Sequence, residues 1–208
     1  MQPKSVYIIG AQCTGKTTLH HALHGDFSRK YPDLQLRTVS EVARQVLREH
    51  KYSRDDLLND PERALELQRL ILVAQWKEET DTGSPTDFLL CDRSGVDPIV
   101  YAVKYGPPQA QIILEGSSHW RYLRDRMKES LVILCPPHQE WLVDDGTRLM
   151  ARSPEEWESV HFIFIQILET NGIAFQVIPK ELLDLEARVD FVSRLWQSSI
   201  LEDQSTGN

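Results

Sequence analysis

Residues 5–17 read Ser-Val-Tyr-Ile-Ile-Gly-Ala-Gln-Cys-Thr-Gly-Lys-Thr. A short apolar run leads into the pattern G-x-x-x-x-G-K-T, and a helical stretch opens directly after it at Thr17-Thr18-Leu19-His20. A strand, a glycine-rich loop and a helix in this order are typical of the Walker A phosphate-binding loop. The alternative is a chance glycine-rich turn, which this combination of context and fixed residues disfavours. The stretch therefore predicts that the chain binds a nucleoside triphosphate.

Each residue type in this loop has a physical task. Gly10 and Gly15 allow the backbone to close its N–H groups around a phosphate, and the next helix directs its positive end at the same anion. Lys16 is expected to reach the β- and γ-phosphates, and the Thr17 hydroxyl to bind Mg²⁺. We therefore expect Mg²⁺ as cofactor and ATP as co-substrate, with GTP left open. The predicted nucleotide-binding residues are Gly10, Gln12, Cys13, Thr14, Gly15, Lys16, Thr17 and Thr18.

Length and charge limit the possible partners. The 208 residues suit a single domain, expected over residues 1–202 with a disordered tail at 203–208. A net charge of −8 without a dense basic patch argues against nucleic acid or an anionic membrane as the main partner. We find no apolar run as long as a membrane span, no targeting segment, and no metal-site spacing among the three cysteines. A reduced, cytoplasmic location is the simplest expectation. The sequence identifies no protein partner.

Strand-like and helical patterns alternate along the chain. This alternation predicts an α/β fold, with a parallel sheet covered by helices on both faces. A long helix is expected from Pro61 with Asp60 as its N-cap, another after Ser153, and a last one over about 185–200. Ligands in such sheets bind beyond the carboxyl ends of the strands. The predicted strands are Val6–Gly10, Leu34–Val39, Phe88–Cys91, Leu131–Cys135 and Phe175–Ile178.

Acidic residues follow two of these strands. Asp92 ends the third strand, where a carboxylate can hold Mg²⁺ through water or accept a proton from a substrate hydroxyl. Alternatively, Asp92 caps the next segment. Glu41 follows the second strand, and substrate contact and helix capping explain it equally well. Arg44, three residues later, either neutralises Glu41 or binds a substrate anion.

A polar, turn-rich segment at about residues 137–155 suits a mobile lid over the triphosphate. Arg148 and Arg152 would stabilise charge on the transferring phosphoryl group and help to exclude water. Ion pairing with neighbouring acidic residues is the alternative. Trp141 would anchor the lid or stack on a ligand base.

Four parts of the chain resemble the NadR-type ribosylnicotinamide kinase domain and the wider group of NadR-like AAA-type ATPase domains. They are the phosphate loop, Glu41–Arg44, the strand that ends at Asp92, and Trp141–Arg148, which reads W-L-V-D-D-G-T-R. The resemblance covers roughly residues 4–200. It implies a P-loop NTPase fold of the nucleoside/nucleotide-kinase type, with a five-stranded parallel sheet in the order 2-3-1-4-5 and an arginine-bearing lid.

The chain departs from the NadR pattern at two places. Gln12, Cys13 and Thr14 stand where that kinase usually has acidic and serine residues, and Asp92-Arg93-Ser94 is more similar to an element of deoxynucleoside kinases.

The resemblance implies ATP- and Mg²⁺-dependent phosphoryl transfer to a hydroxyl of a small nucleoside-like molecule. Lys16, Asp92, Arg148 and Arg152 would handle the phosphates and the metal, and Asp92 or Glu41 would be the base. The alternative is a nucleotide-binding regulatory ATPase or GTPase without a small-molecule acceptor.

Overall fold

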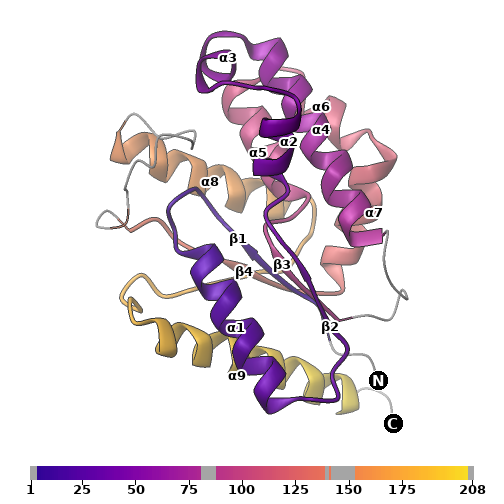
Figure 1. Ribbon diagram of the computed structural model, residues 1–208, viewed down its shortest axis with the longest axis vertical. Coiled ribbons are helices and arrows are strands. Elements are labelled where there is room, and N and C mark those ends of the chain that lie inside the picture. Colours follow the sequence, from indigo (N-terminus) through magenta and orange to yellow (C-terminus); the bar gives the residue numbers. More distant parts are fainter. Residues whose placement is uncertain (1–3, 81–87, 139–140, 142–152, 206–208) are drawn as a thin grey trace.

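The computed structural model describes residues 4–80, 88–138, 141 and 153–205. Its centre is a five-stranded sheet in the order β2-β3-β1-β4-β5, in which every pairing is parallel. The predicted fold class and strand order are therefore confirmed (Figure 1). The strands are β1 (Val6–Ile9), β2 (Leu36–Val39), β3 (Phe88–Asp92), β4 (Leu131–Leu134) and β5 (Gln176–Val177).

Alternating apolar side chains give the sheet two buried faces. Val6 and Ile8 of β1 belong to one apolar cluster, whereas Tyr7 and Ile9 belong to the other. This period of two is what a strand covered on both faces requires. Helices α1 (Lys16–Lys30) and α9 (Leu185–Ser205) lie together on the Val6 face (Figure 1).

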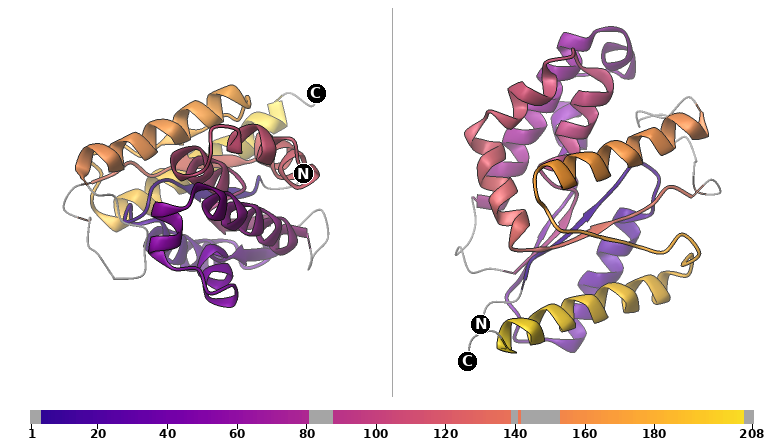
Figure 2. Two further views of the ribbon diagram at one scale, coloured as in Figure 1. Left: turned by 90° about the horizontal axis from the view of Figure 1, so that it is seen from above. Right: turned by 180° about the vertical axis from the view of Figure 1, so that it is seen from behind.

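The Tyr7 face is covered by a larger group of helices, and the view from behind in Figure 2 shows α8 (Pro154–Thr170) crossing it. Next to them, α2 (Ala43–Glu49) and α3 (Arg54–Asn59) pack with α4 (Pro61–Thr80) around a small third cluster that includes Val46 and Leu67. The short α3 was not predicted from the sequence. The covering helices are α4 (Pro61–Thr80), α5 (Val96–Tyr105), α6 (Ala110–Glu115), α7 (Ser118–Lys128) and α8 (Pro154–Thr170).

Helix starts follow the predicted capping residues. The Asp60 carboxylate accepts hydrogen bonds from the backbone N–H groups of Glu62 and Arg63, and Ser153 Oγ accepts one from Glu156 N. These caps satisfy donors that have no partner inside the helix. Among the described residues, no helix combines the length and apolar character needed to cross a membrane.

Two predictions about segments have different outcomes. The last helix continues to Ser205, past the expected domain end at 202, because no glycine or proline interrupts residues 185–205. The predicted lid is not tested, because residues 139–140 and 142–152 lie outside the described part of the chain.

Gly10 fixes how the phosphate loop leaves the sheet. Its φ is 137°, and a Cβ at this position would lie 2.5 Å from the carbonyl oxygen of Cys135. The loop thus starts against the backbone that follows β4, and only glycine fits both the dihedral angle and the space.

A pair of substitutions tests this constraint. Gly10→Ala should lower the free energy of unfolding by about 1–3 kcal/mol or more, because it adds strain and a backbone clash. Gly25→Ala, inside α1 with nothing within 4 Å of the added Cβ, should raise it by about 0.5–1 kcal/mol. Urea unfolding measures both, and equal effects would refute the role given to Gly10.

Candidate active site

Lys16 lies buried in the phosphate loop and is only 5% exposed. Its Nζ donates hydrogen bonds to the Ala11 carbonyl oxygen at 2.5 Å and to Thr14 Oγ1 at 3.3 Å. Burial, followed by the positive charge of Arg93, lowers the pKa of Lys16 to about 8. The pocket around it has a volume of about 370 Å³ and is lined by Cys13, Thr14, Gly15, Lys16, Thr17, Thr18, Glu41, Arg93, Trp141, Leu183, Leu185 and Arg188.

Thr17 and Asp92 meet at this pocket. Thr17 Oγ1 donates to Asp92 Oδ2 at 2.6 Å, and Asp92 is only 2% exposed. Asp92 Oδ1 is buried without a hydrogen-bond partner, so an oxygen ligand is left over for a cation. The described residues contain no group of three or more His, Cys, Asp or Glu that could by itself hold a metal ion. The pair therefore fits Mg²⁺ that is also held by water and phosphates, which is the usual arrangement for this ion.

The segment after β3 is capped by Asp97 rather than by Asp92. Asp97 Oδ2 accepts from Ser94 N at 2.8 Å and from Ser94 Oγ at 3.0 Å. The structure thus offers no capping role for Asp92, which was the structural alternative in the sequence analysis.

Glu41 lies between two arginines. Its Oε1 accepts from Arg93 Nε at 2.6 Å and its Oε2 from Arg44 Nε at 2.9 Å. Burial alone would raise the pKa of Glu41, but Arg93, Lys16 and Arg44 outweigh it and hold the pKa at about 2. Glu41 makes no capping bond to α2 within the described part of the chain, because its two carboxylate oxygens accept from arginine side chains. Arg44 neutralises Glu41, which was one of the two roles considered for it.

Arg93 bridges Glu41 and Asp97. Its Nη1 lies 3.1 Å from Asp97 Oδ1, and its own φ of 82° is in the left-handed region. Burial would lower the pKa of the Arg93 guanidinium. Its charged neighbours, of which Glu41 has the largest effect, instead raise this pKa well above its ordinary value. Arg93 was not among the predicted site residues, although its place directly after Asp92 in the Asp-Arg-Ser element was a signal.

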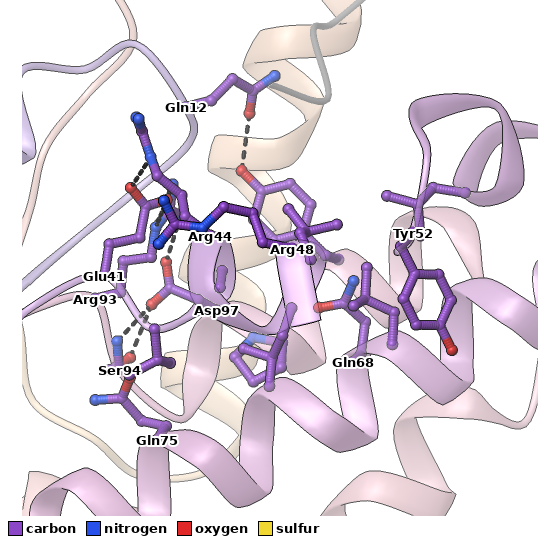
Figure 3. Close-up of a pocket in the computed structure, with 18 of the residues that line it drawn as sticks. Gln12, Glu41, Arg44, Arg48, Tyr52, Gln68, Gln75, Arg93, Ser94 and Asp97 are labelled. Atoms are coloured by element: carbon purple, nitrogen blue, oxygen red, sulfur yellow. Dashed lines mark hydrogen bonds and ion pairs between the residues drawn. The ribbon is translucent and has the colours of Figure 1, made fainter. Parts of the chain in front are cut away.

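A second pocket of about 490 Å³ adjoins the first (Figure 3). The two pockets share Glu41 and Arg93. Its walls come mainly from α2, α4 and the start of α5, and they include the apolar residues Leu47, Leu67 and Ile71. This pocket is wide enough for a small organic molecule beside the phosphate loop.

Gln68 of α4 is the most informative polar residue of this second pocket. It is 6% exposed, and its side chain makes no hydrogen bond within the described part of the chain. Figure 3 shows its amide pointing from the helix into the pocket. Because buried amides normally have partners, this side chain is suited to a ligand. The residue type gave no such signal in the sequence.

The predicted nucleotide-binding residues separate into two groups. Cys13 through Thr18 line the phosphate-loop pocket. Gly10 instead lies at the start of the loop, against the backbone of Cys135. Gln12 lines the second pocket, where its Oε1 accepts a hydrogen bond from the Tyr101 hydroxyl at 2.8 Å. Arg148 and Arg152 lie outside the described residues. Trp141 stacks on Arg188, whose guanidinium carbon lies 4.9 Å from the centre of the Trp141 ring. Arg188 was not among the predicted site residues.

The model of the AAA domain family matches residues 5–188. The chain belongs to this AAA domain family. No curated protein sequence matches the chain, but solved structures share its fold. The crystal structure of NadR protein in complex with NR has a TM-score of 0.69 at 22% identity, over 92% of this chain and 51% of that one. The chain thus spans about half the length of that NadR protein.

Two nucleoside- and nucleotide-kinase structures match over nearly their whole length. Deoxyadenosine kinase from M. mycoides with bound dATP has a TM-score of 0.60 at 16% identity, over 93% of this chain and 99% of that one. Thymidylate kinase from Ehrlichia chaffeensis has a TM-score of 0.60 at 16% identity, over 95% and 100%. The resemblance stated from the sequence is confirmed at the level of family and fold.

The pKa of Lys16 leads to a test of nucleotide binding. Only the protonated amine attracts phosphate, so the affinity for ATP–Mg²⁺ should fall as the pH rises through about 8, towards tenfold per pH unit above it. Calorimetry between about pH 7 and pH 9.5 measures this, with phosphate-free adenosine as control. A lysine with an ordinary pKa of 10.5 would instead leave the affinity for ATP–Mg²⁺ nearly constant over most of this range.

Proposed function

We propose that this protein is a kinase that uses ATP and Mg²⁺ to phosphorylate a hydroxyl group of a small nucleoside-like molecule. One observation carries the proposal: the phosphate-loop pocket and the larger second pocket share Glu41 and Arg93. A carboxylate and a guanidinium therefore stand where a triphosphate and an acceptor would meet. The similar structures include two nucleoside- or nucleotide-kinases, which supports the same class of reaction.

The phosphate side of the site would bind and orient ATP. The backbone of the loop and Lys16 would hold the β- and γ-phosphates, and Thr17 with Asp92 would hold Mg²⁺. When bound, Mg²⁺ neutralises charge that develops on the phosphate oxygens. Arg93 would act at the boundary, because its guanidinium lines both pockets. Arg148 and Arg152 stay proposed as lid arginines that close over the same phosphates.

Glu41 would orient the acceptor hydroxyl. A pKa of about 2 keeps the carboxylate ionised at neutral pH, so it accepts a hydrogen bond from the hydroxyl. Such a carboxylate is a weak base, which suits phosphoryl transfer because its transition state is loose and needs little proton removal. We therefore assign to Glu41 the role that the sequence left open between Glu41 and Asp92, and to Asp92 the metal.

The second pocket suits a planar ring with a polar edge. Leu47, Leu67 and Ile71 provide apolar walls, and the Gln68 amide offers one donor group and one acceptor group to the ligand. A nucleoside combines these features, because its base is flat and polar at the edge while its sugar carries the hydroxyl. The pocket also favours the kinase proposal over the alternative, which is a regulatory ATPase without a small-molecule acceptor.

The proposal is tested by ATP consumption with and without a panel of nucleosides. At least one nucleoside should raise ADP production well above the rate with water alone. Glu41→Gln should lower this acceptor-dependent kcat by about 10²-fold or more, because the hydroxyl loses a negatively charged hydrogen-bond acceptor. Glu49→Gln, an exposed position at the end of the same helix, should behave like wild type. If no nucleoside raises ATP consumption, the regulatory alternative is favoured.

Asp92→Asn separates metal chemistry from nucleotide binding. The substitution keeps an oxygen for Thr17 but removes the negative charge, so kcat should fall by about 10²-fold or more while ATP binding changes far less. Steady-state kinetics and calorimetry on the same preparation measure the two quantities. Wild-type turnover in this variant would remove Asp92 from the catalytic residues.

A further inference from the structure

Arg188 of α9 is buried against the phosphate loop. It is 3% exposed, and its Nη2 donates to the Thr14 carbonyl oxygen at 3.2 Å. A Cβ added to Gly15 would lie 2.7 Å from Arg188 Nη1, so the guanidinium rests directly on the loop glycine. Arg188 also lines the same pocket as Lys16 and Thr17. A residue from the last helix thus reaches the centre of the nucleotide site.

The charge of Arg188 has no carboxylate partner within the described part of the chain. Two other arginines at least half buried do have such partners: Arg93 pairs with Glu41 and Asp97, and Arg126 lies near Glu79. Arg188 Nε is buried without a hydrogen-bond partner. Stacking on Trp141 offsets only part of the cost of burying this cation.

The acidic residue four positions before Arg188 is already used elsewhere. Asp184 Oδ1 accepts a hydrogen bond from Ala187 N at 2.8 Å and so caps the start of α9. This cap fixes the first turn of the helix, which directs Arg188 inwards to the loop instead of to Asp184. The buried guanidinium is thereby available to an anion that enters the pocket.

We propose that Arg188 binds a phosphate group of the nucleoside triphosphate and gives the nucleotide site a cation in addition to Lys16. The inference rests on the proposed function, because it takes a triphosphate as the ligand of the loop. A phosphate fits the observations because it supplies the missing negative charge and accepts the paired N–H groups of a guanidinium. The contact with the Thr14 carbonyl holds the side chain in position before the anion arrives.

Calorimetry with ATP–Mg²⁺ on three variants tests the role of the charge. Arg188→Gln keeps an N–H donor for the Thr14 carbonyl but loses the charge, and its affinity should fall roughly 10- to 100-fold. Arg188→Lys keeps the charge but loses the paired N–H groups, so its affinity should lie between those of wild type and Arg188→Gln. Arg194→Gln, an exposed arginine on the same helix, is the matched control and should leave the affinity unchanged.

Binding of phosphate-free adenosine separates this role from a structural one. Adenosine affinity should be nearly the same in wild type and Arg188→Gln. Equal losses for adenosine and ATP–Mg²⁺, full ATP affinity in Arg188→Gln, or a wild type that does not bind ATP–Mg²⁺ would each overturn the inference. If wild type binds ATP–Mg²⁺ but no nucleoside accepts phosphate, the kinase proposal fails while the assignment of Arg188 stands.

Discussion

The site depends on the pairing of β1 with a parallel strand on each side. At its carboxyl end, Ile8 O accepts from Arg93 N at 3.0 Å and Ile9 O accepts from Cys135 N at 2.8 Å. These bonds bring the ends of β3 and β4 level with the start of the phosphate loop. Thr17 can therefore reach Asp92 across 75 residues of sequence, which is the contact that fits a metal. The close approach of Gly10 to the Cys135 carbonyl follows from the same register.

Burial and neighbouring charges together set the pKa values of Lys16 and Glu41. Lys16, Arg44 and Arg93 gather around Glu41, although the chain as a whole has a net charge of −8. Burial lowers the pKa of Lys16, and its cationic neighbours hold that of Glu41 at about 2. Lys16, Arg93 and Arg188 line the phosphate-loop pocket, and Glu41 is the one acidic residue in its described lining. This excess of cations favours a negatively charged ligand.

The sequence predicted the parts of the site that local patterns encode. The phosphate loop, the strands and Asp92 follow from glycine spacing and apolar runs, and the strand order followed from the family resemblance. Gln68 and Arg188 could not be found in this way, because each looks like an ordinary polar residue of a helix. Tertiary packing alone places them: it buries Arg188 against the loop with its Nε unpaired, and it buries Gln68 in the wall of the second pocket. Glu41 was undecided for the same reason: its contact with Arg93 depends on where β3 ends.

Arg93 shows how the backbone contributes to the same arrangement. A left-handed φ of 82° costs a non-glycine residue about 1–3 kcal/mol. The conformation is retained because Arg93 N is bonded to Ile8 O while the side chain is held by Glu41 and Asp97. With an ordinary φ the chain would leave β3 in another direction, and the guanidinium would not lie between the two pockets. The strained backbone of Arg93 therefore accompanies the placement of its side chain between the phosphate-loop pocket and the second pocket.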